Sequence, residues 1–317
     1  MRKKGKKVLN VIFIVVLYLL IQMLISIGII DSFYELNIVI ICINIILAVS
    51  LNLITGITGQ FSLGHAAFMS IGAYTSAILT AKFNLPFILA LFISGFAASL
   101  AGIMIGLPTL RLKGDYLAIA TLGFGEIVKV IATNTDYIGG AIGFNDIPRY
   151  TNWTWVYISV TATVILVKRF VNSYHGRACR AVKEDEIAAE SVGINTTFYK
   201  ALAFAIGAFY AGVAGSLYAN YFYFIKPDSF GFMKSIDILI TVVFGGIGNI
   251  IGSIIGAVSL SIISLSLQDI AELRMVIYSV VLYLIMIYRN NGMFRKRGFK
   301  IFKNRKKVKY NVGVISK

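Results

Sequence analysis

The chain has 317 residues, of which 58% are hydrophobic and 14% are charged, and its mean hydropathy is +0.81. Soluble domains carry about 25% charged residues and about 45–50% apolar ones, so this composition excludes a soluble enzyme, a disordered segment and a free nucleic-acid-binding domain. It predicts an integral membrane protein, and the excess of 30 Lys and Arg over 14 Asp and Glu, a net charge of +16, has to be placed relative to the membrane.

Apolar segments long enough to cross a bilayer recur along the chain. A helix needs about 20 apolar residues to cross the hydrocarbon core, so we predict an all-α, polytopic membrane helix bundle with about ten spans. The predicted spans are 8–30, 36–54, 64–81, 85–107, 116–133, 153–171, 199–222, about 230–246, about 250–267 and 273–289. The first span is too long for the apolar core of a signal peptide, which has about 7–15 residues, so we expect it to remain uncleaved.

The positive charges predict the orientation of these spans. If ten spans begin on the cytoplasmic side, 24 of the 30 Lys and Arg residues fall in cytoplasmic segments, five fall outside and Lys129 lies within a span. Because cytoplasmic loops of membrane proteins are enriched in Lys and Arg, we expect both termini on the cytoplasmic side of the membrane. The predicted parts are a basic N-terminus at 1–7, a transmembrane domain at 8–290 and a basic cytoplasmic tail at 291–317, which can contact anionic membrane lipid.

Two glycine-rich segments predict breaks in the membrane helices. Segment 55–65 is polar and flexible and contains no Lys or Arg, although it lies between two predicted spans. Segment 244–249 divides the uncharged run 238–267, which is too long for one span, into two short helices. Irregular backbone is tolerated at membrane depth only where protein or a water-filled cavity satisfies it. Interrupted helices of this kind are typical of transport paths.

Ionisable residues within the predicted spans are few. Glu126 and Lys129 are one helical turn apart and can neutralise each other, either as a structural pair against a neighbouring helix or as a functional pair. His65 has no carboxylate nearby in the sequence, which favours a hydrogen-bonding role over a proton relay. The residues that we assign to a translocation path are Gln60, Ser62, Gly64, His65, Glu126, Lys129, Gly245, Gly246 and Gly248.

The longest polar stretch between spans is the loop 172–198. Three carboxylates, Glu184 to Glu186, suit the positive end of a short helix that Gly193 would end. One side of this helix is rich in alanine, so it can enter a shallow groove on a partner, although a solvated connecting loop fits the composition equally well. The residues that we assign to docking are Glu184, Asp185, Glu186, Ala188, Ala189, Glu190 and Gly193.

Several motif blocks resemble one known family. Ala188–Gly193, preceded by acidic residues, resembles the Ala-Ala-x-x-x-Gly motif of ABC-importer permeases, which forms the coupling helix that docks on the ATPase subunit. The blocks Gly59–Phe68, Leu110–Gly123, Arg177–Asn195 and Phe244–Gly248 resemble the LivM-type permeases of the high-affinity branched-chain amino acid transporters. The resemblance runs from about residue 40 to residue 290.

This resemblance implies a type II ABC-importer-like permease domain at 8–290, with the coupling loop at 172–198, in the cytoplasmic membrane of a prokaryote. It implies four partners: a second homologous permease, two ABC ATPases that hold ATP and Mg, and an extracytoplasmic solute-binding protein. The sequence agrees, since it contains no Gly-x-x-x-x-Gly-Lys-Ser/Thr phosphate-binding motif. We therefore expect no cofactor on this chain, no enzymatic activity and no nucleic-acid partner.

Two alternatives remain open at this stage. Related permeases carry urea, short amides or nucleosides, so the resemblance fixes the class of protein more firmly than the substrate. An ion-coupled secondary transporter would instead use Glu126 or Asp237 as its ion site. The scattered Cys42, Cys179, His65 and His175 predict neither a metal site nor a disulfide framework.

Overall fold

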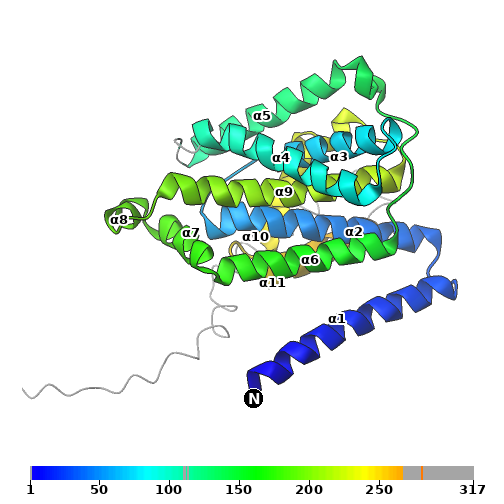
Figure 1. Ribbon diagram of the computed structural model, residues 1–317, viewed down its shortest axis with the longest axis horizontal. Helices are drawn as coiled ribbons and strands as arrows, with labels where there is room; N and C mark the ends of the chain where they lie inside the picture. The colour runs from blue at the N-terminus through cyan, green and yellow to red at the C-terminus, as the bar shows by residue number, and fades with distance from the viewer. Residues whose placement is uncertain (1, 110–111, 113, 267–279, 281–317) are drawn as a thin grey trace, which may run out of the picture. The chain divides into compact units, whose positions relative to one another are not determined.

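The computed structural model describes residues 2–109, 112, 114–266 and 280, with side chains from Ile14 onward. The chain divides into two units, Met1–Asp269 and Ile270–Lys317. All the helices described below belong to the first unit (Figure 1). The predicted tenth span at 273–289, apart from Val280, and the predicted tail at 291–317 lie outside the described residues.

The first unit is a helix bundle whose element order follows the predicted spans. Its first half contains α1 (Arg2–Ser26), α2 (Ser32–Leu51), the π-helix η1 (Asn52–Ile57), α3 (His65–Ala81), α4 (Phe87–Thr109) and α5 (Asp115–Thr133). Its second half contains the 3-10 turns η2 (Asp136–Ile138) and η3 (Gly140–Ile142), α6 (Trp153–Asn172), α7 (Tyr174–Glu184), α8 (Glu186–Ser191), α9 (Thr196–Phe222), the 3-10 turn η4 (Pro227–Phe230), α10 (Phe232–Gly245) and α11 (Ile250–Ser266).

Five helical stretches are long and apolar enough to cross a membrane. They are Ser32–Ile57, Phe87–Thr109, Asp115–Thr133, Trp153–Asn172 and Thr196–Phe222. The helices α3 and α10 have only 17 and 14 residues, fewer than the roughly 20 that a span needs. The all-helical prediction is confirmed for the described residues, which contain no strand beyond the isolated bridge between Phe144 and Ile225. The predicted number of about ten spans is not confirmed.

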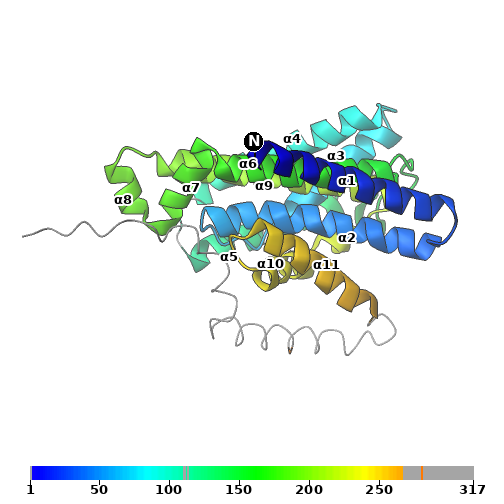
Figure 2. The same cartoon turned by 90° about the horizontal axis from the view of Figure 1, so that it is seen from below.

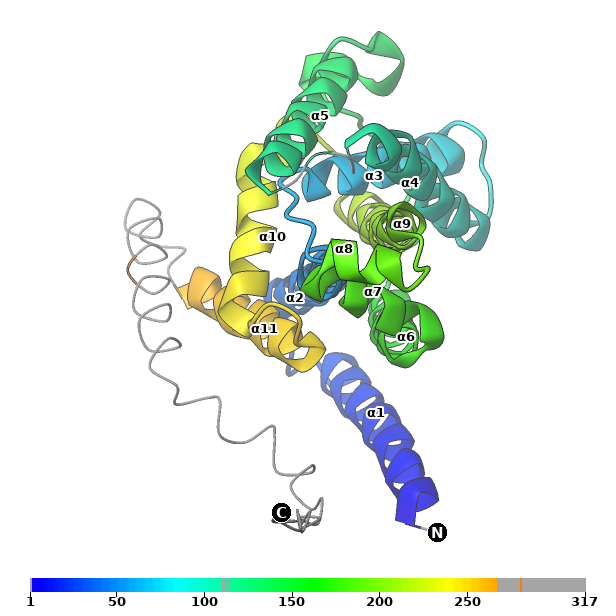
Figure 3. The same ribbon diagram turned by 90° about the vertical axis from the view of Figure 1, so that its left-hand side faces the viewer.

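The helices differ in how deeply they lie within the bundle. In α2 with η1 and in α9, 78% and 72% of the most apolar stretch is buried by the rest of the chain, against 22% in α5. Helix α9 packs against α3 and α4, as the end-on view shows (Figure 3). Helix α1 touches α6 at a few residues, where the Tyr157 hydroxyl donates to the Ile14 carbonyl at 2.7 Å, and its N-terminal end diverges from the bundle (Figure 1 and Figure 2).

Close packing of α3 against α9 depends on glycine residues. A Cβ atom on Gly72 would lie 2.2 Å from the Gly212 carbonyl oxygen, and one on Gly215 would lie 2.0 Å from the Met69 carbonyl oxygen. Helix association in lipid depends on close van der Waals packing, because lipid tails are as apolar as the side chains. These glycines therefore let α3 and α9 approach backbone to backbone.

Both predicted helix breaks are present. The first follows α2, which continues as the π-helix η1 and then as the irregular loop 58–64 before α3 begins. The second lies between Gly245, the last residue of α10, and Ile250, the first residue of α11. In the second break Gly246 and Gly248 adopt positive φ angles of 99° and 86°, a backbone conformation that other residues adopt only at a cost.

Candidate functional site

One end of the bundle carries α7, α8 and the start of loop 58–64, and we call it the α8 end. It is the left-hand end in Figure 1 and faces the viewer in Figure 3. The opposite end, called the far end, carries the loop 134–152 and η4. Most of the residues predicted to dock a partner lie at the α8 end, so its geometry is described first.

The predicted docking loop contains two helices rather than one. Helix α7 was not predicted, although Ala178, Cys179 and Val182 recur with helical spacing and are buried. Glu184 ends α7, so its predicted place in the first turn of the short helix is wrong. Asp185 is instead the N-cap of α8, and its carboxylate accepts a hydrogen bond from the Ala188 amide at 3.0 Å.

The other two acids of this loop turn back toward the bundle. Glu186 forms an ion pair with Lys200 of α9. The Glu190 carboxylate accepts a hydrogen bond from the Thr196 hydroxyl at 2.7 Å. Gly193 ends the helix as predicted, with φ +84°, and the next amide, that of Ile194, donates to the Ala189 carbonyl at 3.0 Å. Helix α8 is therefore fixed to α9 by its own polar side chains.

The face that α8 presents outward is small and apolar. Ile187 and Val192 are 75% and 74% exposed, and Ala188 is exposed beside them. Ala189 is buried, so the prediction that both alanines share one exposed face is wrong. Two large aliphatic side chains held in solvent beside an alanine are typical of a surface that another protein covers.

The polar side chains of the loop 58–64 are buried although its backbone is irregular. Gln60, Ser62 and His65 are each at most 3% exposed. The Leu63 amide donates to the Thr121 hydroxyl at 3.0 Å, and the Ala66 amide donates to the Ser235 hydroxyl at 3.1 Å. Side chains of α5 and α10 therefore satisfy the backbone that no regular helix satisfies here, as burial at membrane depth requires.

Two further contacts position the start of α3. The His65 Nε2 atom lies 2.8 Å from the Ser50 hydroxyl of α2, a contact between two buried side chains that supports the hydrogen-bonding role predicted for His65. A Cβ atom on Gly64 would lie 2.2 Å from the Thr121 carbonyl oxygen, so only glycine fits where the loop crosses α5.

The two helix breaks meet each other. The Gly248 amide of the second break donates to the Asn52 side-chain oxygen of η1 at 2.7 Å. The Lys183 ammonium of α7 donates to the Gly56 carbonyl of η1 at 2.8 Å. We call Asn52, Gly56, Lys183 and Gly248 the break junction. It joins both interrupted segments to the helix that directly precedes α8.

The break junction has no space for a larger residue. A Cβ atom on Gly56 would lie 1.9 Å from the Asn52 side-chain oxygen and 2.4 Å from the Gly248 nitrogen. A Cβ atom on Gly245 would lie 2.2 Å from the Gly252 carbonyl oxygen. These glycines are therefore required by close backbone approach, whereas Gly246 has open space around it and is suited to its positive φ angle.

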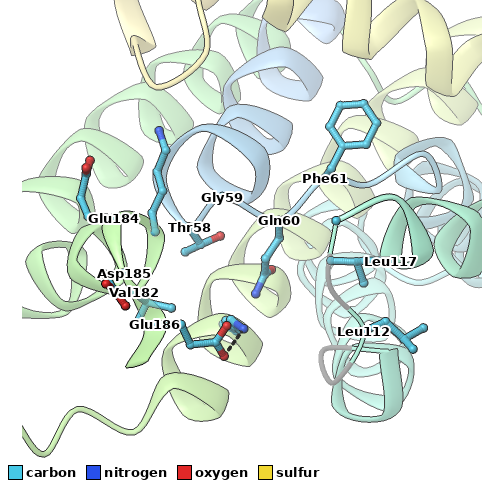
Figure 4. Close-up of a pocket in the computed structure, with 13 residues that line it drawn as sticks. Thr58, Gly59, Gln60, Phe61, Leu112, Leu117, Val182, Glu184, Asp185 and Glu186 are labelled. Atoms are coloured by element: carbon cyan, nitrogen blue, oxygen red, sulfur yellow. Dashed lines mark hydrogen bonds and ion pairs between the residues drawn. The ribbon is translucent and has the colours of Figure 1, made fainter. Parts of the chain in front are cut away.

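A pocket of about 240 Å³ opens beside α8. Both amide atoms of Gln60 are buried there without a hydrogen-bond partner. In Figure 4 the Gln60 side chain points toward Glu186, whose ion pair with Lys200 is drawn as a dashed line. The residues that line the pocket are Thr58, Gly59, Gln60, Phe61, Leu112, Gly114, Leu117, Val182, Lys183, Glu184, Asp185, Glu186 and Lys200.

Two predicted path residues lie away from this group. Lys129 forms its ion pair with Asp228 of η4 at 2.8 Å, a partner that was not predicted, and Glu126 lies near this pair. Glu126, Lys129 and Asp228 line a second pocket of about 330 Å³ near the far end. The structure thus brings Gln60, Ser62 and Gly64 of the loop together with His65, the first residue of α3, and places Glu126 and Lys129 elsewhere. Within the described part of the chain, no cluster of His, Cys, Asp or Glu is placed to hold a metal ion.

Sequence reasoning missed three residues of the α8 end. Lys183 and Lys200 were read only as positive charges that report orientation, and Asn52 was read as part of an apolar span. Lys200 is 9% exposed, and a Lys this buried is rare unless it is paired. Its acidic partner is 14 positions away in the sequence, so no local pattern identifies the pair.

The chain is similar in sequence to known proteins over most of its length. The family model for the "Branched-chain amino acid transport system / permease component" matches residues 34–288. The chain is 36% identical to the high-affinity branched-chain amino acid transport system permease proteins LivM of Salmonella typhimurium and Escherichia coli K12, over 78% of this chain and 67% of each relative. It is 27% identical to the corresponding permease protein LivH of Salmonella typhimurium, over 68% of this chain and 79% of that protein. No solved structure matches the chain.

Proposed function

The chain belongs to the permease component family of branched-chain amino acid transport systems, and on this basis we propose that it is a membrane permease subunit of an ABC importer. Its substrate would be a branched-chain amino acid, carried across the cytoplasmic membrane with ATP hydrolysed by partner subunits. The single observation that carries the coupling part of this proposal is α8, which is fixed to α9 by its acids and exposes Ile187 and Val192.

Four partners complete the proposed importer. The match to both LivM and LivH, two permease proteins of one organism, supports pairing with a second, homologous permease. Two ATPases would bind ATP and Mg and dock on α8, and this chain would hold no cofactor. An extracytoplasmic solute-binding protein would deliver the substrate to the far end. Membrane lipid would surround the bundle, with both termini in the cytoplasm.

About ten spans would complete this arrangement. The five long apolar helices would be joined by α1, by the shorter α3, α10 and α11, and by the segment 273–289. The parts would be a cytoplasmic N-terminus at 1–7, a permease domain at 8–290 and a cytoplasmic tail at 291–317.

The break junction offers a route from the ATPases to the bundle interior. A push on α8 reaches α7 directly, because Asp185 alone separates the two helices. Lys183 then transmits the movement to Gly56, and Asn52 transmits it to Gly248. The residues proposed to form the path are Gln60, Ser62, Gly64, His65, Glu126, Lys129, Gly245, Gly246 and Gly248.

The docking proposal is tested by a matched pair of substitutions. Ile187→Asp places a charge on the exposed face of α8, whereas Ile142→Asp places one on an equally exposed residue of η3, since these side chains are 75% and 78% exposed. We expect Ile187→Asp to lose the copurifying ATPase and the ATP-driven uptake, and Ile142→Asp to keep the ATPase. Retention of both by Ile187→Asp would refute the docking surface.

The substrate is tested by uptake into vesicles that contain the full transporter. We expect ATP-dependent uptake of labelled leucine, isoleucine and valine, and no competition by urea, a short amide or a nucleoside. Uptake that persists without ATP and stops when an ionophore collapses the ion gradients would instead support the ion-coupled transporter.

A further inference from the structure

The pocket beside α8 contains a polar side chain for which the protein provides no partner. Gln60 is 3% exposed, and neither its amide nitrogen nor its amide oxygen has a hydrogen-bond partner. A buried amide left unpaired costs about 1–3 kcal/mol, so an occupant that pairs with it is favoured. We propose that this pocket is a binding site for a small zwitterion that carries an ammonium and a carboxylate group.

The charges around Gln60 favour a zwitterion over an anion or a cation. The Gln60 side chain points toward the Glu186 and Lys200 pair (Figure 4). An anion would be repelled by Glu186 and by the nearby Glu184 and Asp185, all of which line the pocket. A cation would be repelled by Lys200 and by Lys183, which also line the pocket. A zwitterion satisfies both members of the pair, with its carboxylate toward Lys200 and its ammonium toward Glu186.

The remaining wall accepts an aliphatic side chain. Leu117 and Val182 are each 4% exposed, and with Phe61 and Leu112 they form the apolar part of the lining. The cavity of about 240 Å³ far exceeds the roughly 30 Å³ that one water molecule occupies in the liquid. The pocket therefore has room for an α-amino acid with a short branched side chain.

Occupation of this pocket would restrain α8. The ligand would bridge Glu186, the first residue of α8, and Gln60 of the loop 58–64. It would therefore stabilise the arrangement described here and slow any cycle in which α8 moves relative to that loop. This consequence rests on the proposed function, because it assumes that ATPases drive α8, whereas binding itself does not depend on it.

The first experiment measures binding without ATP or a solute-binding protein. The full chain, with the subunits that copurify with it, is placed in lipid nanodiscs and titrated with labelled leucine. Isocaproate, which lacks the ammonium, and isoamylamine, which lacks the carboxylate, serve as competitors. We expect leucine to bind and both competitors to fail. Competition by isocaproate, isoamylamine or urea at the concentration at which leucine competes would overturn the zwitterion assignment.

Substitutions locate the binding. We expect Gln60→Leu to weaken leucine binding about tenfold, because it removes hydrogen bonds to charged groups, and Leu117→Trp to abolish it by filling the cavity. Gln22→Leu, on the half-buried side of α1, serves as the matched control and should bind as the unaltered chain does. Thermal melting would first confirm that each variant is folded. Equal leucine binding by all three variants would then mean that the pocket holds water only.

The last measurement separates the site from the transport proposal. If both proposals hold, leucine added to the nanodiscs lowers ATPase activity in the unaltered complex and not in Leu117→Trp. Suppose that the unaltered complex binds leucine, that Leu117→Trp does not, and that the complex has no ATPase activity. This result would support the site and refute the proposed function. ATP-driven uptake with no leucine binding at this pocket would refute the site alone.

Discussion

In the part of the chain that the structure describes, an ion pair lies at each end of the bundle, and these two pairs differ in their surroundings. At the α8 end, the side chains of Glu186 and Lys200 are 29% and 11% exposed. At the far end, those of Asp228 and Lys129 are 81% and 31% exposed. Exposed pairs contribute little to stability, whereas removing one partner of a buried pair leaves an uncompensated charge. The comparison indicates that losing one partner of the ion pair destabilises the protein more at the α8 end than at the far end.

The ends also differ in what joins their segments. At the α8 end, side chains bond to backbone groups of distant helix breaks, as Lys183 does to Gly56 and Asn52 does to Gly248. At the far end, Phe144 and Ile225 exchange backbone hydrogen bonds at 2.9 and 3.1 Å, and Arg149 donates to the Tyr223 hydroxyl at 3.1 Å. At the α8 end, side chains thus connect helices that are distant in sequence. At the far end, the hydrogen bonds join one loop to another.

The largest effect is expected from breaking the partly buried pair of Glu186 and Lys200. Glu186→Ala leaves Lys200 unpaired, so the free energy of unfolding should fall by about 3 kcal/mol. Chemical denaturation in detergent measures this loss, and the double variant Glu186→Ala with Lys200→Met should regain most of it. If Glu186→Ala alone is as stable as the unaltered chain, the ion pairs at the two ends do not differ in their contribution to stability.

A slightly smaller loss is expected from crowding the break junction. Gly56→Ala forces a methyl group against Asn52 and the Gly248 backbone, and overpacking of this kind costs about 1–3 kcal/mol. Gly123→Ala is the matched control, because nothing lies within 4 Å of a Cβ atom there. Thermal melting of both variants checks the prediction. The prediction fails if Gly56→Ala and Gly123→Ala have the same melting temperature.

Lys183→Met should affect coupling more than stability. It removes one charge-assisted hydrogen bond to the Gly56 carbonyl, worth about 1.5 kcal/mol. We expect ATP hydrolysis to continue while uptake per ATP falls, with partial rescue by Lys183→Arg, which restores a donor. An unchanged ratio of uptake to ATP hydrolysis in Lys183→Met would exclude this residue from the coupling route.

The far-end pair should be insensitive to mild acid. The hydrogen bond and positive charge of Lys129 hold the pKa of Asp228 below its ordinary value of 3.8. What the pair contributes is therefore present above that ordinary value and is lost only as the pH falls through the lower folded value. Asp228→Asn should shift the melting temperature less than Glu186→Ala does, and the size of that shift should not change between pH 7 and pH 5. A shift that shrinks over this range would contradict the lowered pKa.

The smallest effect is expected from a thiol reagent on Cys179 of α7. This side chain is fully buried. Burial raises the pKa of its thiol to about 11, so the reactive thiolate is scarce at pH 8. A maleimide should label this residue only after unfolding, as mass spectrometry of the labelled peptide would show. Rapid labelling of the folded chain would mean that α7 does not pack as described.

Much of this protein could be predicted from local sequence. Apolar runs predicted the helices because each run must bury its backbone polar groups within itself in lipid. Glycine clusters predicted both breaks, at 58–64 and at 246–249, and Gly193 predicted the end of α8 because its αL conformation suits glycine. These features depend on neighbours a few residues away, which the sequence displays directly.

Only the tertiary structure decided which polar side chains meet. Glu126 was the natural partner of Lys129 by helical spacing, yet Asp228, from a turn about 100 positions later, occupies that place. Glu186 appeared to face a partner protein and instead pairs with Lys200, and the two helix breaks, some 200 residues apart, share the Asn52 to Gly248 bond. The physical reason is that polar groups inside a bundle pair with whatever lies closest in space, and helix packing, not sequence spacing, brings them together.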